Sequence, residues 1–260
     1  LTLARPGKET IYGVLGRMEV LLDCFRSNER YQNFVPFLEV YYLMTKAVAE
    51  KHVMKKHFYK DFASMERLDV HFASLYFKPL RVFLETGRAM RPWQHFFLYC
   101  DQENGIPFLQ MLLGINAHIN ADLCRTLAAL RYDQREDFFA IDRVLEEVLP
   151  EILAYLAFHE HDVFACAGLL FKKFFVDELH AIVVRWRHDA WENSHAFMHV
   201  RRPLWAKVHA ATEQLGEELI NIFEGIRRAR RLQTAMPELH TLSVRIQQSV
   251  SGQRRPMLRT

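Results

Sequence analysis

The sequence predicts an all-α protein, folded as a single-domain, multi-helix bundle-like structure. Along most of the 260 residues, apolar side chains recur every three or four positions, the spacing of amphipathic helices. Only 10 glycines and 9 prolines occur, which argues against sandwiches, barrels and loop-rich α/β folds. The 20 phenylalanines indicate a bulky, aromatic core. We expect six to nine helices in one domain over residues 1–236, followed by a weakly structured basic tail over 237–260.

Four helices are expected in the first hundred residues. Apolar residues from Ile11 to Phe25 share one helical face, and Pro36 suits the first turn of the next helix. Gly87 is a plausible stop for the third, and the fourth begins near Pro92. The expected helices therefore cover residues 10–27, 36–53, 64–86 and 91–100.

The remainder of the chain is also predicted to be helical. A clear turn over 101–105 precedes a long helix over 107–130, which is apolar nearly all the way round and so largely buried. Pro150 is expected to interrupt the next helix. The expected helices of this half cover residues 107–130, 136–158, 162–200 (one helix or two) and 203–232.

Charge and cysteine content narrow the function classes. The formal net charge of +3 is too small to indicate nucleic acid by itself, and no recognition-helix motif accompanies the basic residues. Much of the basic excess is C-terminal, where we expect a solvated helix end and tail, or else contact with an anionic surface or substrate carrier. Those residues are Arg227, Arg228, Arg230, Arg231, Arg254, Arg255 and Arg259.

Cellular location follows from what the sequence lacks. Its four cysteines form no CxxC pair, which is typical of reduced thiols in a cytoplasmic protein. No run of about 18 apolar residues and no secretion signal is found, so neither a membrane span nor export is expected.

One polar constellation interrupts the long apolar helix. His118 and Asp122 are four residues apart and so share a helical face. A buried, unpaired carboxylate is costly, and a metal ion is an efficient compensation because it binds carboxylates and neutral imidazoles. The alternative is a hydrogen-bonded His–Asp pair with no metal. Asn116 and Asn120 alternate with these residues and are weaker candidate ligands.

Further ligands would have to come from other helices, as in metal sites built between the helices of bundles. Asp69 and His71 lie in an apolar stretch, and Asp137 begins a helix beside a phenylalanine. His188 and Glu192 share a face by the four-residue spacing and are weaker candidates. The sequence has no HExxH, GxSxG, phosphate loop, dinucleotide fingerprint or paired ExxH motif.

Two segments resemble the uncharacterised domain family DUF5995. They are residues 65–77 (MERLDVHFASLYF) and 107–123, which contains GINAHINADL and fits the specific string GxNAHINxDL. Weaker similarity extends over 41–191. The resemblance implies an all-helical, enzyme-like fold, related to noncanonical non-haem diiron monooxygenases of natural-product biosynthesis.

The same resemblance implies a ligand set. It carries over Asp69, His118 and Asp122, with Asp137 as a further candidate. His71 stands where an apolar residue is expected, and Asp142 stands where an asparagine is expected. The role of the helix that carries Asp142 is therefore open.

Our leading hypothesis is a metal-dependent monooxygenase that hydroxylates a hydrophobic small molecule or its carrier-bound form. Two iron ions would activate O2 with electrons from an external donor; zinc or manganese are the alternative metals. One alternative is a zinc-dependent phosphoesterase or other hydrolase. Another is a helical binding module without enzymatic activity, in which the polar cluster is a satisfied hydrogen-bond network.

Overall fold

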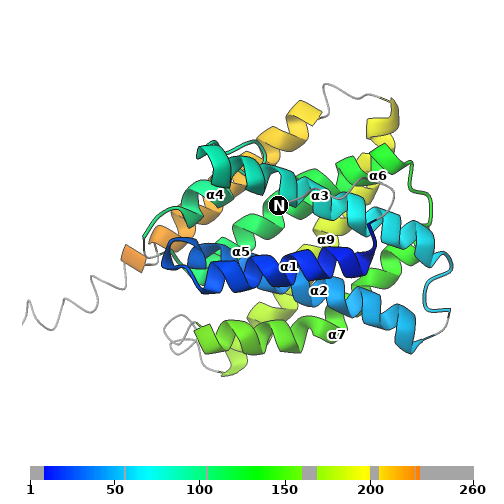
Figure 1. Cartoon of the computed structure of the whole chain (residues 1–260), viewed down its shortest axis with the longest axis horizontal. Coiled ribbons are helices and arrows are strands. Elements are labelled where there is room, and N and C mark those ends of the chain that lie inside the picture. Colours follow the sequence, from blue (N-terminus) through cyan, green and yellow to red (C-terminus); the bar gives the residue numbers. More distant parts are fainter. Residues whose placement is uncertain are drawn as a thin grey trace, which may run out of the picture. The chain divides into compact units, whose positions relative to one another are not determined.

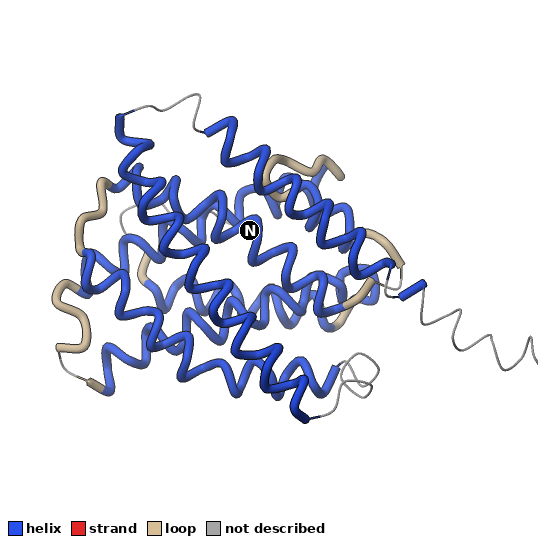
Figure 2. Tube along the Cα trace, turned by 180° about the vertical axis from the view of Figure 1, so that it is seen from behind, coloured by secondary structure: helices blue, strands red, loops and turns tan. Residues whose placement is uncertain are grey.

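The computed structural model describes residues 9–55, 57–103, 105–159, 169–199, 205–225 and 227–228. The chain divides into two compact units, Leu1–Glu217 and Glu218–Thr260. In the second unit the described residues are helical. Everything else below concerns the first unit. The all-α prediction is confirmed, because the described residues form helices and connecting turns and no strand (Figure 2).

Figure 1 shows the order of the described helices along the chain. Along the chain they are α1 (Ile11–Arg26), the 3₁₀ helix η1 (Glu29–Phe34), α2 (Val35–Met54), α3 (Phe62–Thr86), α4 (Gln94–Cys100), α5 (Pro107–Ile115), the π-helix η2 (Asn116–Leu123), α6 (Cys124–Leu130), α7 (Arg135–His159) and α9 (Leu169–His199). A further helix covers residues 205–225. The expected helix over 203–232 is thus described only in part, and the predicted tail over 237–260 lies outside the described residues.

Local chemistry explains where helices begin and end. The Thr10 hydroxyl accepts a hydrogen bond from the Gly13 amide at 3.2 Å and caps α1. The Asp61 carboxylate does the same for α3 through the Ser64 amide, at 3.0 Å. Gly87 ends α3 with a φ of 69°, a left-handed conformation that favours glycine. The predicted stop at Gly87 is therefore confirmed.

The predicted interruption at Pro150 is wrong. α7 continues through this residue from Arg135 to His159. Proline cannot donate the helical hydrogen bond to the carbonyl of Glu146, but both residues are exposed, so water can satisfy that carbonyl.

The long helix predicted over 107–130 forms, but its middle is not α-helical. Residues 116–123 adopt a π-helix between α5 and α6. π-Helices account for well under 1% of residues and occur mostly as short insertions, frequently at functional sites. The π segment coincides with the polar motif that contains His118 and Asp122.

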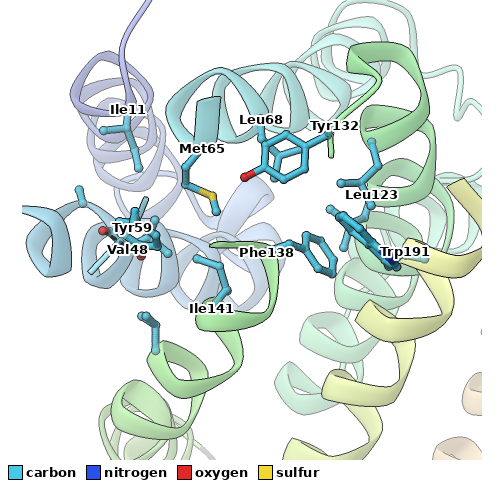
Figure 3. Close-up of a cluster of buried hydrophobic side chains, with 14 of the residues drawn as sticks. Ile11, Val48, Tyr59, Met65, Leu68, Leu123, Tyr132, Phe138, Ile141 and Trp191 are labelled. Atoms are coloured by element: carbon cyan, nitrogen blue, oxygen red, sulfur yellow. Dashed lines mark hydrogen bonds between the residues drawn. The ribbon is translucent and has the colours of Figure 1, made fainter. Parts of the chain in front are cut away.

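Helix packing places this π segment at the centre of the first unit. α2 contacts α1, α5 and α7, while η2 and α6 contact both α3 and α9. A buried apolar cluster joins these layers: Figure 3 shows Met65 from α3, Ile141 and Phe138 from α7, and Trp191 from α9 among its members. The rings of Phe138 and Trp191 lie 5.0 Å apart between centroids. Among the described helices, none is long and apolar enough to cross a membrane.

Candidate functional site

His118 is buried among aromatic rings. Only 3% of its surface is exposed. Its ring stacks on Phe72 of α3 with a centroid distance of 3.5 Å and an interplanar angle of 6°, and the Tyr41 ring of α2 makes a T-shaped contact with it at a centroid distance of 4.6 Å. Neither ring nitrogen has a hydrogen-bond partner among the described residues. Burial lowers the pKa of His118 well below 6.5, so the imidazole is neutral at neutral pH.

Asp122 lies beside His118 and is held by a tryptophan. The indole Nε1 of Trp93 donates a 2.8 Å hydrogen bond to Asp122 Oδ2. His118 Nδ1 is 3.6 Å from the same oxygen, which is close contact without a well-formed hydrogen bond. Burial raises the pKa of Asp122 well above 3.8, while the Trp93 hydrogen bond and the positive charge of Arg125 act in the opposite direction. Burial therefore drives both members of the pair toward their uncharged forms.

An apolar cavity of about 150 Å³ opens beside His118. Its wall is built from α2, α3, α5, η2, α7 and α9, so helices from both halves of the first unit contribute to it. Most of the lining side chains are Leu, Ile, Val, Met and Phe. A dry cavity of roughly this volume in another protein accommodates benzene, which sets the scale of a fitting molecule.

Among the described residues, five polar side chains on this wall have buried atoms without a hydrogen-bond partner. On α2, Tyr41 and Thr45 are one turn apart and expose no surface to solvent at their hydroxyls. Asp69 on α3 contributes Oδ2, His118 contributes its ring nitrogens, and His180 on α9 contributes Nε2. Buried polar atoms in native proteins nearly always have partners. Five such groups on one wall therefore make the cavity a candidate binding site.

The pKa values of Asp69 and Tyr41 both depend on burial and on nearby carboxyl groups. Burial, followed by the nearby negative charge of Glu66, raises the pKa of Asp69 from 3.8 to about 7. Burial also raises the pKa of Tyr41, and the negative charges of Asp69 and Asp122 raise it further. Both carboxyl groups are thus close enough to the Tyr41 hydroxyl to affect its ionisation, although only Asp69 lines the cavity.

Asp137 lies outside the cavity, where its carboxylate binds backbone amides. Its two carboxylate oxygens accept hydrogen bonds from the backbone amides of Lys60 and Asp61, at 2.7 and 2.8 Å. It does not line the cavity, unlike its neighbour Phe138. Asp137 therefore fixes the turn that precedes α3.

The two asparagines of the π segment form a chain of hydrogen bonds. Asn120 donates to Asn116 Oδ1, and Asn116 donates to the carbonyl oxygen of Thr212, both at 2.9 Å. They tie η2 to the helix over 205–225. On the opposite side of the motif, His71 Nδ1 lies 3.4 Å from the Thr126 hydroxyl, so His71 is also outside the cavity.

Of the two α9 residues proposed as metal ligands, His188 belongs to a polar group around Asp142. His188 Nε2 and Arg187 Nε each lie 2.9 Å from a different oxygen of Asp142, while Glu192 is exposed. Arg187 is buried and also donates to the Phe138 carbonyl at 2.8 Å. A carboxylate at position 142, rather than the expected asparagine, compensates the buried guanidinium of Arg187.

Whether this site can hold a metal ion depends on which His, Cys, Asp and Glu side chains lie together. Within the described residues, no three His, Cys, Asp or Glu side chains are grouped so that they could hold one ion. Two of the sequence-predicted ligands, His118 and Asp122, lie together, and Asp69 shares the cavity wall with His118. The described residues alone therefore do not supply the ligand set of a two-iron centre.

Four site residues, His180 of α9 among them, were not predicted from the sequence. Tyr41 and Thr45 carry hydroxyls at positions four apart on an otherwise apolar helical face, a spacing that could have revealed them. Trp93 follows Pro92 in a helix start, and nothing in its local pattern indicates that its indole reaches residue 122.

The chain belongs to the family of unknown function DUF5995, whose family model matches residues 11–222. This match includes every helix that lines the cavity and confirms the family resemblance. No curated protein and no solved structure matches the chain.

Proposed function

We propose that this protein binds a small, largely apolar molecule in the cavity beside His118. The observation that supports this most directly is the combination of an apolar cavity with five polar side chains on its wall that have no partner among the described residues. Apolar pockets with a few convergent polar groups are the usual form of small-molecule sites. The apolar wall would supply affinity, and the polar groups would orient the bound molecule.

His118 is suited to contact that molecule directly. A neutral imidazole has one ring nitrogen that donates and one that accepts a hydrogen bond. The stacked Phe72 ring and the Tyr41 edge hold the imidazole plane in place. The Trp93 hydrogen bond holds Asp122 beside Nδ1 of this imidazole.

Isothermal titration calorimetry with toluene tests this proposal. Val48→Phe adds a ring to the cavity wall and should abolish toluene binding, because the cavity would lose most of its free volume. Val20→Phe makes the same change at an exposed position of α1 and should bind toluene like the wild type. Absence of heat with the wild-type protein from toluene and from each of its analogues benzyl alcohol, benzylamine and benzoate would contradict the proposal.

A second proposal is a metal-dependent monooxygenase that acts on the bound hydrophobic molecule. The observation that favours it is the pairing of His118 with Asp122 on a π-helix, beside the unpartnered Asp69 oxygen on the cavity wall. His118 and Asp69 have atoms available to bind one ion, but the described residues do not complete its ligand set. Iron would supply O2 activation with an external electron donor, and zinc would instead suit the hydrolase hypothesis.

Elemental analysis of the purified protein separates these metals from each other and from the metal-free binding module. His118→Ala and Asp122→Ala should each lower the bound iron severalfold if these side chains are ligands. His52→Ala, at an exposed position, is the matched control and should retain the metal. Equal iron in all three variants would exclude His118 and Asp122 as ligands, while zinc alone would favour hydrolysis.

A further inference from the structure

The polar end of the cavity restricts the charge of the molecule that fits there. Among the described wall residues, the negative group is Asp69, and Asp122 adds a second carboxyl behind His118. Arg187 is the one lysine or arginine on that wall, and its guanidinium is already bonded to Asp142 and to the Phe138 carbonyl. A carboxylate or phosphate in this cavity would face the Asp69 carboxyl and would find no free lysine or arginine among the described wall residues; the imidazoles on that wall are His118, which is neutral, and His180 of α9.

The unpartnered atoms offer several acceptors close to Asp69. Asp69 Oδ2, the hydroxyl oxygens of Tyr41 and Thr45, and one nitrogen of a neutral His118 can each accept a hydrogen bond, while the hydroxyls and the other imidazole nitrogen can also donate one. A primary ammonium group carries three N–H donors and no acceptor, so it matches several acceptors at once. A molecule without polar groups would leave all of these side chains unsatisfied.

The aromatic side chains of the cavity wall also suit a positively charged ligand. Tyr41, Phe72 and Phe37 all line the cavity around His118. The faces of such rings attract cations, particularly where water is excluded. Burial and the negative charge of Glu66 raise the pKa of the Asp69 carboxyl to about 7, and a cation bound beside this carboxyl would lower that pKa.

Building on the proposed binding function, we infer that the ligand is a small hydrophobic primary amine whose ammonium group pairs with Asp69. Its apolar part would be about the size of one aromatic ring, as the cavity volume of about 150 Å³ allows. The ammonium would lie at the end formed by Tyr41, Thr45 and His118. The apolar part would lie against the leucine and isoleucine side chains of α7, among them Leu145 and Leu149.

Four probes of nearly equal size test the inference by calorimetry at about pH 8, where the amine is still protonated. They are benzylamine, benzyl alcohol, toluene and benzoate. Benzylamine should bind most tightly and benzoate least. Benzoate binding as tightly as benzylamine, or toluene binding as tightly, would overturn the inference and leave the binding proposal standing. Binding of none of the four would overturn both.

The variant Asp69→Asn tests whether the Asp69 carboxylate pairs with the ammonium group of the ligand. It should weaken benzylamine binding roughly thirtyfold, because a buried charge pair loses one member, and it should leave toluene binding within about twofold. Asp189→Asn removes a carboxylate from an exposed position of α9 and should change neither affinity. An unchanged benzylamine affinity in Asp69→Asn would contradict the inference. If that variant does not fold, the affinities of the four probes for the wild-type chain still test the inference.

Discussion

The Trp93 indole donates a hydrogen bond to Asp122 Oδ2 at 2.8 Å, between two side chains that are each 1% exposed. This contact gives the buried carboxyl a partner in place of water. It also joins the residues before α4 to the π segment η2, which are 29 positions apart in the sequence. The position of Asp122 beside His118 therefore depends on a residue outside the polar motif.

Replacement of Trp93 by Phe should destabilise the protein by about 1–3 kcal/mol beyond the loss of packing, because it leaves a buried acceptor unsatisfied. Urea denaturation of a double-mutant cycle with Asp122→Leu measures this coupling. In the Asp122→Leu background the same tryptophan substitution should cost less. Additive costs would show that the hydrogen bond contributes nothing to stability.

The turn before α3 should depend on Asp137. Asp137→Ala removes the acceptor of two backbone hydrogen bonds, from Lys60 and Asp61, and should lower the free energy of unfolding by roughly 1–3 kcal/mol. Asp133→Ala, at an exposed neighbouring position, should change it by less than about 0.5 kcal/mol. Because Asp137 is outside the cavity, toluene or metal binding by the folded variant should be unchanged. A loss of binding without a loss of stability would return Asp137 to the list of site residues.

Gly114 lies one turn before His118, where a side chain has no room. A Cβ there would overlap the ring and Cβ of Phe37, which packs around His118. Gly114→Ala should therefore destabilise the protein by about 1–3 kcal/mol and weaken binding in the cavity. Gly16→Ala in α1 meets open space and should stabilise the helix by about 0.5–1 kcal/mol. Thermal denaturation of the two variants checks the opposite signs.

Helical periodicity was sufficient to predict the all-α fold, because it is a local property of the sequence. The glycine stop at Gly87 and the buried helix after Pro107 both follow from side chains within a few positions. The π segment was not predicted, because a helix with apolar residues on all sides has no face that distinguishes a 3.6-residue turn from a wider one. Pro150 was misjudged because the consequence of a proline depends on whether water reaches the carbonyl it leaves unbonded.

The site was predictable only where a polar residue conflicts with its local surroundings. His118 and Asp122 stand out in an apolar helix, and the structure places them 3.6 Å apart. Asp137 showed the same local conflict, yet its carboxylate is used by two backbone amides from a loop 76 and 77 positions away. Sequence spacing alone cannot distinguish a carboxylate that faces a cavity, such as Asp69, from one that caps a distant turn.

Asp69 should make the stability of the protein depend on pH. Its pKa is about 7 in the folded state, against 3.8 for an ordinary aspartate, so the folded state binds more protons between those values. Its contribution to stability is therefore complete below about pH 4 and is lost as the pH rises toward about 7. Asp69→Asn removes this group, while His118 and Asp122 continue to titrate in both proteins.

Urea denaturation of the wild type and Asp69→Asn across this range measures the difference in their free energies of unfolding. The wild type should lose stability relative to the variant as the pH rises, by no more than about 1.4 kcal/mol per pH unit, the limit for one group. Asp189→Asn, with an exposed carboxylate replaced, should follow the wild type at every pH. A difference that stays constant would mean that Asp69 is already compensated in the folded chain, and an increase with pH would mean that it is paired with a cation even without a ligand.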